Sequence, residues 1–455
     1  MDRKRRDYPW RRGHRRIVTA LFCFCGVLAL LAAMVHWLGA STLQQEIAAI
    51  HAKGEPVTPQ ELRQRYPEPP EDKNAAKTYE KSFSAAKESV ATEDFRRRTG
   101  KVYNSPTKDL LAEDFHQWMK ERLAENAEAL ALLHEAADKP AAQYPIDLGK
   151  GWDGAIPNLL KIRTSAVLLQ LEALLAAEDG DTARPVEAVR AGLAVGNALS
   201  DAPLLIMQMI RFACYGITCS GLRRMLEVAR FSDDELAQMQ SALRAADDEE
   251  ALTRALIGER VMTLVAFDHP VQMAPGIRQA DEWFPGGSAV ASGLLRMAST
   301  ASGLREKYLS LMGQVIDASR NPSPDALSRI KQIGERANSD HSWLPMFSVN
   351  QIAPNFYRAE VQLAHNSAVV RSAGTTLAVE RWRLANGRMP ESIGQLVPAF
   401  LPAVPLDPYN GQPLRYKPGE DGYQVYSVGE DLIDNGGDDS PKENADIVFH
   451  VVHSP

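Results

Sequence analysis

The stretch from Asn158 to Leu199 reads NLLKIRTSAVLLQLEALLAAEDGDTARPVEAVRAGLAVGNAL and contains two amphipathic runs joined by the polar segment EDGDTARP. In both runs apolar residues recur at three- and four-residue intervals, which is the spacing of one face of an α-helix. Gly180 follows Glu178 and Asp179 and is a typical C-terminal cap residue for the first run. We therefore predict two helices, 158–177 and 183–199, that pack as an antiparallel hairpin like those of helical repeat proteins.

The same periodicity extends over most of the chain between residues 73 and 385. Ser232, with Glu235 three residues later, forms a capping box and marks the start of a further helix. No fixed repeat period accompanies the pattern, so we do not expect a regular solenoid. We predict one large all-helical domain over 73–354. Its other helices are expected at 74–87, 113–137, 203–228, 233–246, 250–267, 300–318 and 324–337.

An uncharged segment precedes this domain. Residues Ile17–Leu38 read IVTALFCFCGVLALLAAMVHWL, 22 residues without Asp, Glu, Lys or Arg. As a helix this run is ~33 Å long, enough to cross a hydrocarbon core of ~30 Å. Eight of the 51 Lys and Arg residues lie before it, within 1–16. By the positive-inside rule we predict a single membrane anchor in the cytoplasmic membrane, with a basic cytoplasmic tail over 1–16 and a periplasmic body. A cleaved signal peptide is the alternative, because small residues follow the run: Gly39, Ala40 and Ser41.

The charge of the body argues against one class of partner. The whole chain has a net charge of −7, and removing residues 1–16 leaves 43 basic and 56 acidic residues, a net charge of −13. A body this acidic repels a phosphate backbone, so we expect no nucleic-acid partner. We do expect contact with membrane lipid, through residues 17–38. Repeated prolines predict a linker or stalk over 39–72: Pro56, Pro59, Pro67, Pro69 and Pro70.

The four cysteines show no metal or redox spacing. Cys23 and Cys25 lie within the predicted membrane segment. Cys214 and Cys219 are five residues apart, which places them on different faces of a helix. We predict two buried thiols at the second pair rather than a disulfide or a metal pair.

The residue pattern changes near residue 385. A long helix is expected over 355–385, and turn residues then recur every few positions. Leu414–Lys417 and Tyr423–Val428 alternate between apolar and polar residues on either side of PGEDG, which predicts a β-hairpin. Ile447–Val452 is a candidate third strand. The fold class is therefore mainly α, with a small α+β unit over 355–455 built on a short antiparallel sheet.

This last unit resembles the C-terminal domain of the major pseudopilins of bacterial type II secretion. The resemblance covers roughly 90 residues and implies a long helix, a proline-flanked loop, a small antiparallel sheet and an acidic loop that binds calcium. The matching positions are Asn386, Gly387, Pro390, Asp407, Pro408, Gly411, Pro413, Tyr416, Ser427, Gly429 and Asp431.

The acidic loop supports a calcium site on its own composition. Seven carboxylates lie between Glu430 and Asp446, against one cation, and calcium prefers six to eight oxygen ligands in flexible loops. The alternative is a solvated acidic loop that binds nothing. Asp431 and Asp446 match the ligands that the resemblance implies, and Asp434 and Asp438 are added from local geometry. Leu432 stands where the family usually has glycine, so a positive φ at this position would cost energy.

Other features set this chain apart from an ordinary pseudopilin. The membrane segment contains no acidic residue and follows no prepilin-type leader, and some 320 residues separate it from the resembling unit. We therefore expect neither prepilin processing nor incorporation into a pseudopilus as a standard subunit.

No common catalytic motif is present for phosphate, zinc or nucleophile-elbow chemistry. Glu259 and Arg260, in a largely apolar run, are expected to form an ion pair rather than a catalytic pair. The leading hypothesis is a non-enzymatic, membrane-tethered envelope protein whose helical domain serves as an interaction or scaffold surface for a protein partner. The alternatives are an envelope hydrolase with a dispersed active site and an accessory component of a secretion machine.

Overall fold

The structure is a computed structural model and describes residues 42–87, 111–153, 156–269, 303–339, 349–438 and 446–453, with the short pieces 288–289 and 292–293. It is mostly helical, with one three-stranded antiparallel sheet, which confirms the predicted mainly-α class. The predicted membrane segment 17–38 lies outside the described residues.

The predicted helical hairpin is present. It consists of α7 (Leu159–Glu178) and α8 (Ala183–Asn197), which pack closely against each other. Gly180 has a φ of +80°, and its N–H donates to the carbonyl of Ala177, so it caps α7 as predicted. The Ser232 and Glu235 capping box is also confirmed at the start of α10 (Asp233–Arg244).

The remaining predicted helices are present in the expected order, with one break, and α2 falls in the segment that was predicted as a linker. The segment 113–137 is two helices, because Asn126 interrupts it. Its side-chain amide donates to the carbonyl of Arg122 and its side-chain oxygen accepts from the N–H of Lys87, so the side chain competes with helical bonding. The helices are α2 (Pro59–Arg65), α3 (Ala76–Ala85), α5 (Glu113–Glu125), α6 (Ala127–Ala137), α9 (Leu205–Val228), α11 (Ala251–Asp268), α15 (Leu304–Ser319), α16 (Ser323–Ser339) and α17 (Val349–Asn386).

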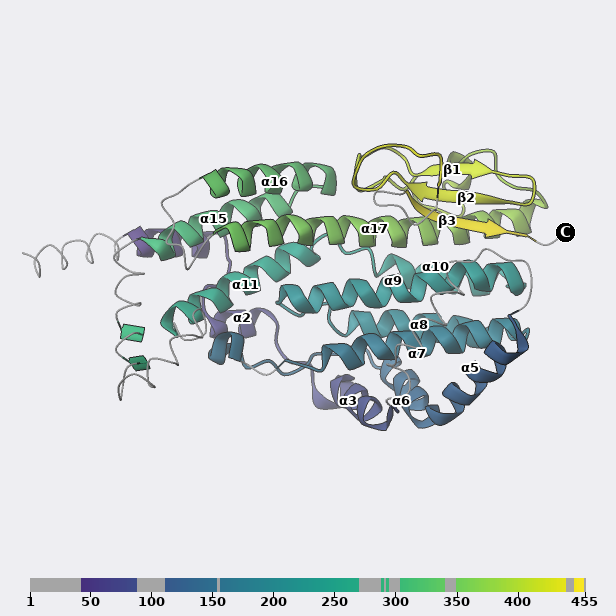
Figure 1. Ribbon diagram of the computed structural model, residues 1–455, viewed down its shortest axis with the longest axis horizontal. Helices are drawn as coiled ribbons and strands as arrows, with labels where there is room; N and C mark the ends of the chain where they lie inside the picture. The colour runs from purple at the N-terminus through teal and green to yellow at the C-terminus, as the bar shows by residue number, and fades with distance from the viewer. Residues whose placement is uncertain are drawn as a thin grey trace, which may run out of the picture.

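Helix α17 organises the molecule and runs along most of its long axis (Figure 1). Its first half packs against α16, and its second half carries the sheet. On its other side lie α9 and α10, followed by α7 and α8 and then by α3, α5 and α6. One hydrophobic core runs through these layers from Ile50 to Val451 and includes side chains from both predicted domains.

The sheet has the order β1–β2–β3 and is antiparallel throughout. Its strands are β1 (Arg415–Pro418), β2 (Gly422–Ser427) and β3 (Ile447–Val452), close to the three predicted segments. Val425 and Val451 are fully buried. The Tyr423 hydroxyl donates to Glu380 on α17 at 2.8 Å. Apolar burial and this polar contact together hold the sheet on α17.

Helix α9 is the one described helix that has the length and apolar composition needed to cross a membrane. Its side chains are nevertheless packed among α7, α8, α11 and α17. Cys214 and Cys219 are free and fully buried, which confirms the predicted pair of buried thiols, and burial raises the pKa of each to about 12.

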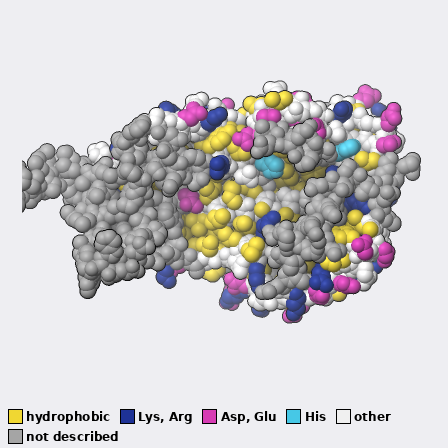
Figure 2. Space-filling view, in the orientation of Figure 1, with side chains coloured by type: hydrophobic (Ala, Val, Ile, Leu, Met, Phe, Trp, Pro, Cys, Tyr) yellow, Lys and Arg dark blue, Asp and Glu magenta, His cyan; other side chains and the backbone are white. Residues whose placement is uncertain are grey.

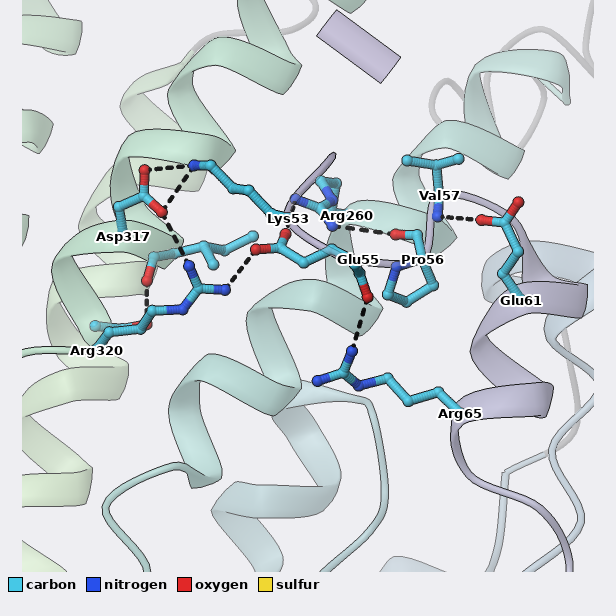
Figure 3. Close-up of polar contacts among 12 residues, drawn as sticks. Lys53, Glu55, Pro56, Val57, Glu61, Arg65, Arg260, Asp317 and Arg320 are labelled. Atoms are coloured by element: carbon cyan, nitrogen blue, oxygen red, sulfur yellow. Dashed lines mark hydrogen bonds and ion pairs between the residues drawn. The ribbon is translucent and has the colours of Figure 1, made fainter. Parts of the chain in front are cut away.

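The segment predicted as a linker is anchored to the helical body. Residues 42–52 are helical, and a capping box formed by Thr58 and Glu61 starts α2. Between these helices Glu55 is buried, and its carboxylate contacts both Arg260 of α11 and Arg320, the C-cap residue of α15 (Figure 3). Arg260 also donates to the carbonyl of Pro56 at 3.1 Å. This part of the predicted linker is therefore not an extended stalk.

The expected pairing of Glu259 with Arg260 is wrong. Adjacent residues point to different sides of a helix, and the two side chains have separate partners. Arg260 reaches Glu55, whereas the Glu259 carboxylate accepts from the N–H of Leu205 at 2.9 Å. Burial raises the pKa of Glu259.

Candidate calcium site

The acidic loop follows the end of β2 and precedes β3 (Figure 1). Four of its described residues have a positive φ: Gly429, Leu432, Gly436 and Gly437. Glycine adopts this conformation freely, and three glycines therefore allow the loop to fold back on itself. Of its acidic residues, Asp439 and Glu443 lie outside the described residues.

Leu432 is the exception among these positions. Its φ is +61°, which is the left-handed conformation that costs a side-chain-bearing residue energy. Its side chain is 57% exposed, and the neighbouring Ile433 is 59% exposed. The leucine therefore gains little from packing, and the position has the backbone conformation for which a glycine is suited.

Asp446 is the most buried of the four predicted ligands, at 6% exposure. One carboxylate oxygen accepts from the N–H of Gly437 at 2.8 Å and the other from the N–H of Asn435 at 3.4 Å. Burial raises the pKa of Asp446, and the negative charges of Asp434 and Asp431 raise it further against these hydrogen bonds. The three carboxylates thus interact electrostatically.

Asp434 faces the sheet. Its carboxylate accepts from the Tyr426 hydroxyl at 3.1 Å and from the N–H of Gly436 at 2.9 Å, and Arg415 Nε lies 3.5 Å away. Burial would raise the pKa of Asp434, but these contacts together hold it below its ordinary value. A cation at Asp434 would therefore compete with partners on β1 and β2.

Asp431 and Asp438 are less enclosed. Asp431 is half-buried and accepts from the N–H of Ile433 at 2.9 Å, which leaves most of its lone pairs for other ligands. Asp438 is exposed. Within the described residues, no three acidic, histidine or cysteine side chains converge as metal ligands. A calcium ion here would need backbone carbonyls to complete its shell, as calcium loops commonly provide.

Asp407 was matched to the pseudopilin pattern, but no structural role was predicted for it. Asp407 is fully buried and accepts from the Ser427 hydroxyl and the N–H of Val428, both at 2.9 Å, and from the N–H of Tyr409 at 3.0 Å. It joins the DPYNGQP loop to the end of β2, where the acidic loop begins. The signal available in the sequence was the Asp-Pro turn, in which an aspartate bonds to backbone N–H groups.

A second set of buried charges was also missed. The Glu380 carboxylate accepts a hydrogen bond from the Tyr423 hydroxyl. It also lies 3.0 Å from Nε2 of His453, the residue just after β3. Nearby, Arg224 of α9 pairs with Glu178 of α7 at 2.7 Å, and both side chains are at most 3% exposed. These contacts link the C-terminal strand, α17, α9 and α7. Their members are far apart along the chain and have no shared motif.

Comparison with known proteins adds no relative to this geometry: no protein-family model, no curated protein and no solved structure matches the chain.

Proposed function

We propose that this chain is a membrane-anchored, extracytoplasmic protein of the bacterial envelope. In this proposal its helical body is an interaction surface, and its C-terminal module resembles a pseudopilin head stabilised by calcium. The uncharged segment Ile17–Leu38, with the basic residues before it, supports the anchor and its orientation.

The observation that carries the calcium proposal is the mutual repulsion of the loop carboxylates. Asp431 and Asp434 both raise the pKa of the buried Asp446, so the folded loop holds negative charges close together at an energetic cost. A divalent cation would offset this repulsion. Asp431 and Asp446, with backbone carbonyls, would hold the ion, and Asp434 and Asp438 are the additional candidates.

Thermal melting of the full-length chain in detergent tests this proposal. We expect calcium to raise the melting midpoint relative to chelator, because a ligand that binds only the folded state stabilises it by mass action. Asp431→Ala should abolish the increase. Glu420→Ala is the matched control, because Glu420 is an exposed carboxylate in the β1–β2 turn, outside the loop. Equal midpoints with and without calcium for the unmodified chain would reject the calcium site.

An apolar patch supports the interaction surface. Ile156, Leu160 and Ile206 are 47%, 63% and 50% exposed, near the starts of α7 and α9. Figure 2 shows hydrophobic side chains gathered over this end of the helical layers. Exposed apolar clusters mark protein-binding surfaces more often than isolated apolar residues do. We therefore propose that the partner protein contacts this patch.

Two experiments address location and partner separately. A reporter fused after Pro455 should be active in the periplasm, and activity on the cytoplasmic side would overturn the proposed topology. Crosslinking from cysteines placed at Leu160 and Ile206 should capture a partner in cells. A cysteine at Glu391, which is 78% exposed on the opposite, C-terminal module, is the control and should not capture it.

A further inference from the structure

A pocket of about 660 Å³ lies between α9, α17 and the first residues of β3. This volume is within the range of sites that hold small organic ligands. It is separate from the exposed apolar patch at the starts of α7 and α9, and Asp446 is its one contact with the predicted calcium ligands.

On the side formed by α9 and α17, the pocket has unfilled space. Gly216 of α9 lines it, and a Cβ atom at this position would meet nothing within 4 Å. Opposite Gly216, Gln362 and His365 of α17 also line the pocket. They are three residues apart, so they lie on one face of the helix. The structure shows no hydrogen bond or ion pair for either side chain within the described part of the chain.

His365 lines the pocket, and its side chain is exposed. The protein atoms around the ring lower the pKa of His365, which favours the neutral imidazole with one donor and one acceptor. Gln362 adds an amide donor and an acceptor. Two adjacent side chains therefore present hydrogen-bonding groups of the kind that pair with a peptide unit.

The charged residues of the pocket are segregated. Glu430 and Asp446 lie at the end where β3 begins, and Tyr357 near the start of α17 donates to Glu430 at 3.3 Å. Arg223 lines the pocket from the C-terminal part of α9. Burial raises the pKa of Glu227, one turn further along α9, and the positive charge of Arg223 opposes this rise. The carboxylates therefore line the pocket from the acidic loop and the start of β3, and the guanidinium lines it from α9.

The walls between these charges are apolar and come from Val361, Val369 and Phe449. We propose that this pocket binds a short peptide with free termini. The peptide ammonium pairs with Glu430 and Asp446, and its terminal carboxylate pairs with Arg223. Gln362 and His365 bond to the peptide amide, and an apolar side chain packs on the valines. This inference does not rest on the calcium proposal, but the two share Asp446, so a bound ion and the peptide ammonium would compete for its carboxylate.

Calorimetric titration of the full-length chain with the tripeptide Ala-Leu-Ala tests the pairing directly. Chelator is present, so that no metal competes at Asp446. We expect binding of the free tripeptide, at least tenfold weaker binding of its N-acetylated and C-amidated forms, and loss of binding when both ends are blocked. Failure of the free peptide to bind, or equal binding of all four forms, would overturn the proposal.

Variants locate the site. Gly216→Leu places a side chain in the pocket and should abolish binding. Gly313→Leu is the matched control, because Gly313 is also a helical glycine with open space around its Cβ position, and it should bind as the unmodified chain does. Arg223→Gln should remove the difference between the free and C-amidated peptides while keeping the preference for a free amine. Persistence of the carboxylate preference in this variant would overturn the role of Arg223.

Discussion

Glu55 and Arg260 form a buried ion pair in which Oε2 lies 2.7 Å from Nη1, with side chains only 3% and 1% exposed. Arg320 contacts the other oxygen of the same carboxylate. These two contacts of Glu55 hold the segment that follows the helix 42–52 against α11 and the end of α15 (Figure 3). Removing one partner of a buried pair leaves the other charge uncompensated.

We therefore predict that Glu55→Ala lowers the free energy of unfolding by about 3–5 kcal/mol, measured by denaturant titration. Lys53→Ala is the control, since Lys53 and Asp317 also lie 2.7 Å apart but are 45% and 50% exposed. An exposed pair contributes about 1 kcal/mol or less. Equal losses in the two variants would contradict the role given to the burial of Glu55.

Gly258 of α11 shows where a glycine is required by packing. A Cβ atom there would lie 1.6 Å from the carbonyl oxygen of Pro203. Gly258→Ala should therefore destabilise the protein, although alanine is the better helix former. Gly313→Ala, in open space on α15, should instead stabilise it by about 0.5–1 kcal/mol. Thermal melting distinguishes the two, and a higher midpoint for Gly258→Ala would show that α11 can move away from Pro203.

At Leu432 we predict that a substitution to glycine stabilises the protein, in contrast to the loss of stability expected for Gly258→Ala. Its φ is +61° and its side chain is largely exposed, so glycine removes strain and loses little burial. Leu432→Gly should raise the free energy of unfolding by about 1 kcal/mol. Ile433→Gly removes a similarly exposed side chain at a residue without a positive φ, and it should give no gain. The difference between the two variants in chemical denaturation isolates the backbone contribution.

Local patterns predicted the elements of this fold well. The expected strand Ile447–Val452 and the start of α8 at Ala183 match the structure, because periodicity and turn residues act over a few positions. The break at Asn126 was missed, because the partner that stabilises it is the distant N–H of Lys87. A pattern within one helix contains no information about such a partner.

The same limit explains what the sequence did not reveal about the sites. The carboxylates of the acidic loop are close in sequence and were found together. The pocket draws Gly216, His365 and Phe449 from three distant segments, and Glu55 contacts Arg260 although the two are far apart in the sequence. These juxtapositions are products of tertiary packing, and each member alone is an ordinary residue.

Glu360 of α17 provides a pH-dependent prediction. It is 1% exposed, one oxygen accepts from the Ser323 hydroxyl of α16 at 2.8 Å, and the other has no hydrogen-bond partner among the described residues. Burial raises its pKa to about 7, and the negative charge of Glu249 acts in the same direction. The folded state therefore holds a proton on Glu360 that the unfolded state has released above its ordinary pKa of 4.5.

Because the folded state binds more protons in this window, stability falls as pH rises from about 4.5 to about 7. One pKa unit corresponds to about 1.4 kcal/mol, so ionising Glu360 costs the folded state about 3 kcal/mol at pH 8. Glu360→Gln removes this cost. We expect its stability relative to the unmodified chain to rise by about 3 kcal/mol between pH 5 and pH 8, in urea titrations at each pH. Glu335→Gln, an exposed carboxylate on α16, should show no such trend, and a pH-independent difference for Glu360→Gln would mean that Glu360 does not titrate in this range.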